Sequence, residues 1–178
     1  MTPKEFEILL QKRAQEIAVY ASSRWPAEAG NTALRFINGN FRAQGYQGRS
    51  FQPWKKGKKK RGTTLVNKGH LRSASYYVTG VGVVTMRNTR PYAAIHNEGG
   101  YINATQSVNQ YTRKAHTRRF KGKRIKVKAT IISAHMRKIN TKIDARPFFP
   151  TTNNPSPVLN NAVERKILAE FKRIFYNN

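Results

Sequence analysis

The sequence predicts an α+β fold in which an antiparallel β-sheet is flanked by N- and C-terminal helices, with a long basic β-hairpin inserted as an arm. Three observations lead to this prediction. Both ends of the chain carry apolar stripes at helical spacing, the region between them has strand-like composition, and one central segment alternates charged and apolar residues. We expect a single domain over residues 1–178, with the arm inserted at about residues 101–142.

The N-terminal stripe predicts a helix that begins at a capping box. Thr2 and Glu5 have the spacing of such a box, and Pro3 stands at the first helical position. The apolar residues that follow at three- and four-residue steps are Phe6, Leu9, Leu10, Ile17, Tyr20 and Ala21. We therefore expect a helix to about Ser22, broken by Trp25-Pro26.

Two further helices are expected from the same spacing. Residues 29–41 allow a second helix, although Gly30 and Gly39 weaken it. Near the C-terminus, Ser156-Pro157 caps a segment whose apolar stripe consists of Leu159, Ala162, Val163, Ile167, Phe171 and Ile174. Both terminal stripes are expected to face the core, so they carry no functional information.

The region between the helices has the texture of strands and loops. Residues 45–62 are expected to form a loop, and residues 65–75 a short helix around Gly69. Residues 77–87 are rich in Val and Thr and are expected to form one strand. Residues 124–130 alternate strictly between polar and apolar residues, and three of the four polar ones are basic. This pattern predicts one strand of a long hairpin with a charged and an apolar face.

The positive charge is concentrated in the centre of the chain. The 178 residues include 34 Lys and Arg against 8 Asp and Glu, a formal net charge of +26. Residues 29–143 hold 25 of these basic residues and a single acidic one, Glu98. Such a density repels itself in the folded state, so we expect a polyanion or an acidic protein surface nearby. Aromatic residues make up 11% of the chain, which favours a folded core over a disordered polycation.

The residue types that catalysis requires are scarce. The chain has no Cys, which excludes disulfides, thiolate metal sites and Cys nucleophiles. Metal-dependent phosphodiester hydrolysis gathers several carboxylates, whereas the centre offers only Glu98, with Asp144 just beyond it. The four histidines are scattered at His70, His96, His116 and His135. No phosphate-binding glycine loop or GxSxG motif occurs. We expect no enzyme activity and no catalytic, metal or cofactor site.

The basic segments are the candidate binding residues, for a polyanion or an acidic partner. They are Lys55, Lys56, Lys58, Lys59, Lys60, Arg61, Arg118, Arg119, Lys121, Lys123, Arg124, Lys126 and Lys128. No RNA-binding aromatic motif, GXXG loop, zinc finger or recognition helix accompanies them, so sequence-independent attraction is expected. The polar N-terminus and the absence of long apolar runs lead us to expect neither a secretory signal nor a membrane partner.

An ordered series of segments carries a family resemblance. Trp54 is followed by LVNKGHLRSAS at residues 65–75, YAAIHNEGG at 92–100 and IDARPFF at 143–149. In this order they resemble the phage virion morphogenesis family, which includes tail completion proteins and the G-like tail proteins of Mu-type phages. The residues that match the family pattern are Trp54, Gly69, Leu71, Arg72, Ser75, Tyr92, Ala93, His96, Gly99, Arg146, Pro147 and Phe148. We interpret these as scaffold residues, with Arg146 expected to pair with Glu98 or Asp144.

The resemblance implies a non-enzymatic structural protein of the head–tail joint, a tail completion or terminator protein or a neck connector needed for virion assembly. It implies self-association in a ring, a hexamer being one option, and contact with neck, adaptor or tail-tube proteins. The location implied is the tail or neck of the virion, with the host cytoplasm during assembly. The chain departs from the family in its long interval between Gly100 and Ile143, whose basic arm we expect to contact DNA or an acidic adaptor ring. The alternative is a non-viral, sequence-independent nucleic-acid-binding protein, and a metal-dependent nuclease is a third option.

Overall fold

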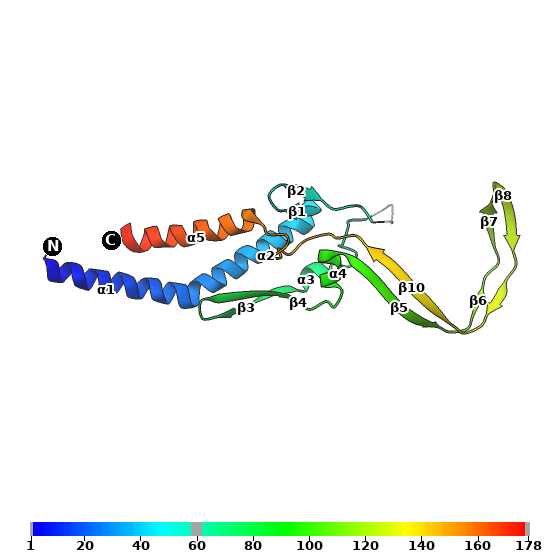
Figure 1. Ribbon diagram of the computed structural model, residues 1–178, viewed down its shortest axis with the longest axis horizontal. Coiled ribbons are helices and arrows are strands. Elements are labelled where there is room, and N and C mark those ends of the chain that lie inside the picture. The colour runs from blue at the N-terminus through cyan, green and yellow to red at the C-terminus, as the bar shows by residue number, and fades with distance from the viewer. Residues whose placement is uncertain (1, 58–61, 177–178) are drawn as a thin grey trace. The chain divides into compact units, whose positions relative to one another are not determined.

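Helices and antiparallel strands both occur in the structure, which confirms the predicted α+β class (Figure 1). The structure is a computed structural model and describes residues 2–57 and 62–176. The chain divides into two compact units. Unit 1 comprises Met1–Gly99 with Asp144–Asn178, and unit 2, which we call the arm, comprises Gly100–Ile143.

Unit 1 begins with two helices that run on without a break. Helix α1 (Pro3–Val19) starts at the expected capping box, where the Thr2 hydroxyl accepts the Glu5 N–H at 3.3 Å and the Thr2 N–H donates to the Glu5 carboxylate at 2.7 Å. A π-helical turn, η1 (Tyr20–Arg24), leads directly into helix α2 (Trp25–Ala43). The expectation that the first helix ends before a break at Trp25-Pro26 is therefore wrong.

The π-helical turn explains why proline does not end the helix here. The Trp25 N–H bonds to the carbonyl of Tyr20, five residues back, and Pro26 has no N–H to place. The Ser22 carbonyl, which an N–H at position 26 would take, instead accepts the N–H of Gly82 at 3.3 Å. Pro26 thus occupies the first turn of α2, where a missing N–H costs no hydrogen bond.

Helix α2 contributes more buried residues than any other helix or strand in the described part of unit 1. Its buried residues are Pro26, Ala29, Gly30, Ala33, Ile37, Asn40 and Phe41. Helix α5 (Pro157–Tyr176) packs beside α2 and α1 and is capped as expected, with the Ser156 hydroxyl accepting the Leu159 N–H at 3.2 Å. Gly30 is required because a Cβ there would lie 2.5 Å from the ring of Tyr77.

The segments between α2 and α5 form short elements. Strands β1 (Gly45–Gln47) and β2 (Phe51–Pro53) pair, so the expectation of a loop from residue 45 is wrong for these residues. Helix α3 (His70–Ser73) lies where a short helix was expected, and α4 (Ala93–Glu98) ends at Gly99. The single strand expected at residues 77–87 is wrong. It is a hairpin of β3 (Ser75–Gly80) and β4 (Val83–Asn88), because Gly82, with φ of 64°, turns the chain back.

The core of unit 1 joins residues that are far apart in the sequence. Ile37, Phe41, Trp54, Leu71 and Phe148 form one buried cluster. The ring of Phe41 lies 5.4 Å from that of Trp54 and 5.2 Å from that of Phe148, centroid to centroid. The indole N–H of Trp54 donates to the Pro147 carbonyl at 2.8 Å. This bond ties the segment after β2 to the segment that returns from the arm.

The arm is a nested antiparallel hairpin. Strand β5 (Gly100–Val108) pairs with β10 (His135–Ile143), β6 (Tyr111–Arg113) with β9 (Thr130–Ile132), and β7 (His116–Phe120) with β8 (Lys123–Val127). A turn at Lys121-Gly122, both at positive φ, closes the hairpin. Within the described residues the strands form five two-stranded sheets rather than one continuous sheet. None of the helices in the described ranges has the length and hydrophobicity that a bilayer span requires.

Candidate polyanion-binding arm

The arm is positively charged along its whole length. Residues 100–143 contain twelve Lys and Arg and no Asp or Glu. All twelve basic residues are exposed. Since the arm has no acidic residue, none of this charge can be neutralised within it, and a partner or counterions must do so.

The pairing of β7 with β8 places only polar side chains on one face of the hairpin. Arg119 stands directly opposite Arg124, and Thr117 stands opposite Lys126. Residues directly opposite each other in an antiparallel pair share a face, so these four side chains lie on one side; we call this side the basic face. Like charges placed opposite each other destabilise a pair of strands. An anion bound between the two guanidinium groups would relieve that repulsion.

The other face of β7 and β8 is not the apolar face that the alternation of residues 124–130 predicted. Ile125 lies opposite Arg118, and Phe120 lies opposite Lys123. The Phe120 ring is 53% exposed, with the Arg118 guanidinium and the Lys121 ammonium each 5.8 Å from its centroid. Both faces therefore present positive charge, because the partner strand contributes cations that the pattern of one strand does not reveal.

The arm has almost no buried surface of its own. No residue of the arm is buried, and only five are half-buried: Val108, Val127, Ile132, Ile139 and Ile143. A two-stranded ladder without a covered face is marginally stable in water. We therefore expect a bound partner to contribute to the order of this arm.

The structure brings seven of the predicted binding residues together on or beside β7 and β8: Arg118, Arg119, Lys121, Lys123, Arg124, Lys126 and Lys128. Lys55 and Lys56 belong to unit 1 and are exposed. The Lys55 ammonium lies 3.2 Å from the Asp144 carboxylate, an exposed pair that contributes little to stability. Lys58, Lys59, Lys60 and Arg61 lie outside the described residues.

The family-like residues in segment 65–75 stabilise the fold of unit 1. Gly69, at φ of 78°, precedes α3 and lets the chain turn into it, and Leu71 is buried against the core. The Arg72 guanidinium donates to the Asn38 side chain on α2 at 2.6 Å. The Ser75 hydroxyl accepts a hydrogen bond from the Asn88 amide at 2.9 Å, which links the ends of β3 and β4.

Segments 92–100 and 143–149 are joined by Asn97, a residue that the sequence did not single out. The Asn97 side-chain oxygen accepts the backbone N–H groups of Phe148 and Phe149, both at 2.9 Å. Asn97 is buried, so it satisfies two donors that water cannot reach. No sequence signal marks it, because an Asn beside a His and a Glu resembles a polar surface residue.

Arg146 does not make the ion pair that was expected of it. Its guanidinium donates to the backbone carbonyls of Lys55 at 2.9 Å and of Asp144 at 3.3 Å, while the Asp144 carboxylate pairs with Lys55. The Arg146 N–H also donates to the His96 carbonyl at 2.8 Å. Arg146 therefore links its own segment to the segments at Lys55 and His96, in each case through a backbone carbonyl.

A groove of about 740 Å³ lies beside these residues, lined among others by Leu65, His70, Tyr92, His96 and Arg146. Burial, reinforced by the charge of Arg146, lowers the pKa of His96, which favours its neutral form. The ring stands edge-on to Tyr92 at 5.8 Å between centroids. Among the described residues, no Asp or Glu lines this groove.

The described part of the chain holds no cluster of three or more His, Asp or Glu residues that could bind a metal ion. Comparison with protein-family models, curated proteins and solved structures finds no significant match for this chain. The basic arm, with its charge and its strand register, is therefore the strongest candidate site.

Proposed function

We propose that this chain is a non-enzymatic structural protein of the phage head–tail joint, needed for virion assembly. The supporting observation is the core of unit 1. Trp54, Leu71 and Phe148 come from separate blocks of the family-like pattern, yet they pack in one cluster. If the chain shares the fold of that family, the residues that match the family pattern should pack together in one core.

In this proposal unit 1 is the scaffold and the arm makes the partner contact. The basic face of β7 and β8 offers two opposed guanidinium groups and an ammonium to an anionic surface. The partner is either DNA that passes through the joint or an acidic surface of a neighbouring neck protein. Assembly into a ring would place several such arms around one axis and multiply a weak contact.

A second candidate is sequence-independent nucleic-acid binding outside a virion. The observation that favours it is the same charge, twelve cations without an acid in residues 100–143. Phosphate contacts of this kind give affinity without reading bases. A nucleic-acid binder would hold DNA without any partner protein, whereas a connector would also need a neck or tail protein.

The decisive experiment is electron microscopy of lysates from a phage that lacks this gene, with complementation by variants. We expect full heads beside detached or abnormally long tails without the gene, and normal particles after complementation with the wild-type chain. The triple variant Arg119→Glu, Arg124→Glu, Lys126→Glu should fail to complement. Normal infectious particles without the gene would overturn the proposal and leave nucleic-acid binding as the better explanation.

A matched control separates the arm from net charge. Arg165, Lys166 and Lys172 are exposed residues on α5. Reversing all three to Glu changes the net charge as much as the arm variant does. This control should complement, since the proposal places the partner contact on the arm.

A further inference from the structure

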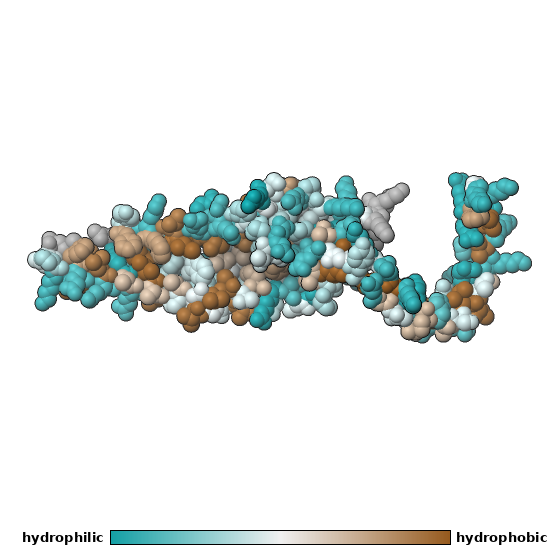
Figure 2. Space-filling model, viewed as in Figure 1, coloured by the Kyte–Doolittle hydropathy of each residue, from teal (hydrophilic) through white to brown (hydrophobic). Residues whose placement is uncertain are grey.

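The first three turns of α1 present an apolar face that no part of the described chain covers. Every residue from 2 to 12 is exposed, and α1 has no buried residue. Phe6, Leu9 and Leu10 are 49%, 36% and 48% exposed, respectively. Figure 2 shows hydrophobic side chains over the helices at this end of unit 1. We call Phe6, Leu9 and Leu10 the α1 tip face. The expectation that the whole N-terminal stripe faces the core is wrong for these three residues, because no described segment packs against them.

The α1 tip face continues a contact that the protein already makes. Further along the same stripe of α1, Ile17 is half-buried and Tyr20 is only 2% exposed. Helix α5 covers this later part: Ile174, near the end of α5, lines one groove with Lys12, Gln15, Glu16 and Val19 of α1. The described part of α5 ends two residues later, at Tyr176, and α1 extends past it (Figure 1).

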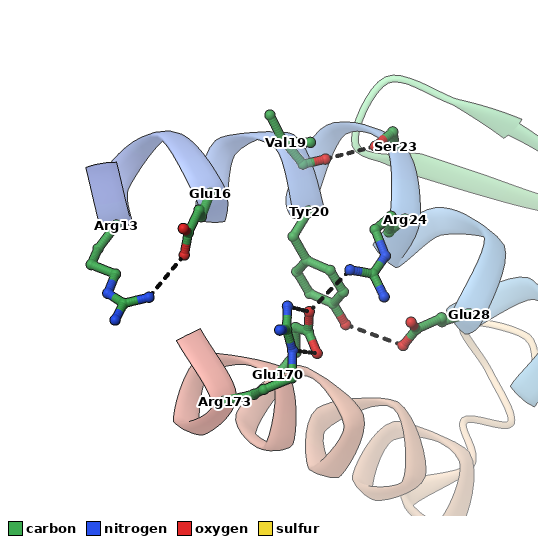
Figure 3. A network of polar contacts seen from close by, with 9 residues as sticks. All are labelled: Arg13, Glu16, Val19, Tyr20, Ser23, Arg24, Glu28, Glu170 and Arg173. Atoms are coloured by element: carbon green, nitrogen blue, oxygen red, sulfur yellow. Dashed lines mark hydrogen bonds and ion pairs between the residues drawn. The ribbon is translucent and has the colours of Figure 1, made fainter. Parts of the chain in front are cut away.

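Helix α5 packs beside the later turns of α1, and one ion pair among the described residues links it to η1: Glu170 on α5 accepts from Arg24 at 3.4 Å. Within α5, Glu170 also accepts from Arg173 at 2.7 Å, and next to this pair the Tyr20 hydroxyl donates to Glu28 at 3.3 Å (Figure 3). Burial, together with Glu28, raises the pKa of Tyr20 to about 12, so this hydroxyl keeps its proton. Because α5 is anchored beside the later turns of α1, the tip face is left for another partner.

The charge of α1 indicates which partner suits it. The helix carries Lys4, Lys12 and Arg13 against Glu5, Glu7 and Glu16, a net charge of zero, in a chain of net charge +26. Repulsion between two copies is therefore weakest at this helix. An acidic protein or an anionic membrane would gain no net attraction here and would favour the basic arm.

The order of the charges also matches a second copy. Glu5 and Lys12 are seven residues apart, two helical turns, and so lie on the same edge of the tip face. If two α1 helices cross antiparallel about Leu9, Glu5 of each copy lies near Lys12 of the other. We propose that the α1 tip face docks antiparallel against the same face of a second copy of this chain.

This contact is two-fold, with the same surface on both copies. A ring is built from head-to-tail contacts between different surfaces, so the dimer neither requires nor replaces the ring of the proposed function. Failure of one proposal therefore leaves the other standing.

Analytical ultracentrifugation of the full chain over a range of concentration and salt tests the proposal. We expect a monomer–dimer equilibrium that is unchanged or tightened as salt rises, because salt screens the repulsion between copies but not the burial of leucine. The double variant Leu9→Ser, Leu10→Ser should raise the dissociation constant at least about tenfold, since it removes two side chains from the centre of the contact. Val81→Ser with Val83→Ser, at residues 85% and 57% exposed on another element, should leave it unchanged.

The charge pair gives a second, independent readout. Lys12→Glu should weaken the dimer, because it would face Glu5 of the other copy. Adding Glu5→Gln, which keeps a side-chain acceptor for the Thr2 N–H of the capping box, should restore part of the affinity relative to Lys12→Glu alone. Circular dichroism checks that each variant keeps its helices. A chain that stays monomeric at every concentration and salt would overturn the proposal. So would a dimer insensitive to the leucine variant, or tip-dependent binding to neutral lipid vesicles without dimerisation.

Discussion

Charge reversal on the basic face of the arm is the most informative perturbation of the candidate site. In the variant Arg119→Glu, Arg124→Glu, two opposed guanidinium groups become two opposed carboxylates. The variant leaves unit 1 untouched, because both residues lie in the arm. Loss of binding would therefore report on the arm and not on the stability of the core.

The expected salt dependence of DNA binding follows from the number of phosphates that the basic face can contact. Arg119, Arg124 and Lys126 lie on that face, with Lys128 continuing the alternation. Four phosphate contacts give a slope of log affinity against log salt of about −3.6 for duplex DNA. Affinity should then fall about a hundredfold between about 50 and 200 mM salt. Losing two contacts should reduce the slope to about −1.8 and weaken binding at low salt.

Fluorescence anisotropy with labelled duplexes of unrelated sequence measures both quantities. The wild-type chain should bind the duplexes with similar affinity, since the contacts are to phosphates. Lys166→Glu with Lys172→Glu on α5 is the control of equal charge, and its slope should stay at the wild-type value. Equal slopes for the arm variant and the wild type would refute the assignment of the basic face, and equal losses in both variants would indicate a net-charge effect.

Three predictions concern unit 1. Gly30→Ala should destabilise the fold by about 1–3 kcal/mol in thermal denaturation, because its Cβ would meet the ring of Tyr77, whereas Gly39→Ala, with open space around it, should be neutral or stabilising. Asn97→Ala should lower the free energy of unfolding by about 2–4 kcal/mol, because it leaves two backbone N–H groups without an acceptor. Asn97→Asp keeps the acceptor and should lower it less. Equal losses in the two variants would contradict this reasoning. The pKa of His96 is lowered in the folded state, so at this residue the unfolded chain binds a proton more readily than the folded chain. The free energy of unfolding should therefore fall as pH drops below about 6.5. Denaturant titrations at several pH values should show that His96→Gln flattens this dependence.

Local patterns predicted the elements whose cause is local. The capping box at Thr2 and the cap at Ser156 both form as expected, because each needs only residues within a single helical turn. The short helix at residues 70–73 forms for the same reason. The basic character of the arm is likewise a property of composition and needs no knowledge of the fold.

Elements whose cause is distant were predicted wrongly or not at all. The helix continues through Pro26 because a π-helical turn and the distant Gly82 N–H together remove the cost of the proline. The strand expected at residues 77–87 is a hairpin because the turn at Gly82 lets two short strands pair with each other. Asn97 was overlooked because the two N–H groups that it binds lie about fifty residues further along the chain.

The α+β class, the helices at both ends and the charge of the arm could be predicted because they depend on neighbours in the chain and on composition. Three features could not be predicted: Arg119 stands opposite Arg124, cations lie beside Ile125 on the second face of β7 and β8, and α5 leaves the first turns of α1 uncovered. These features depend on which strand or helix lies opposite, and at what register. A one-residue change of register would move every side chain of a strand to the other face, so the pattern of a single strand cannot establish what it meets.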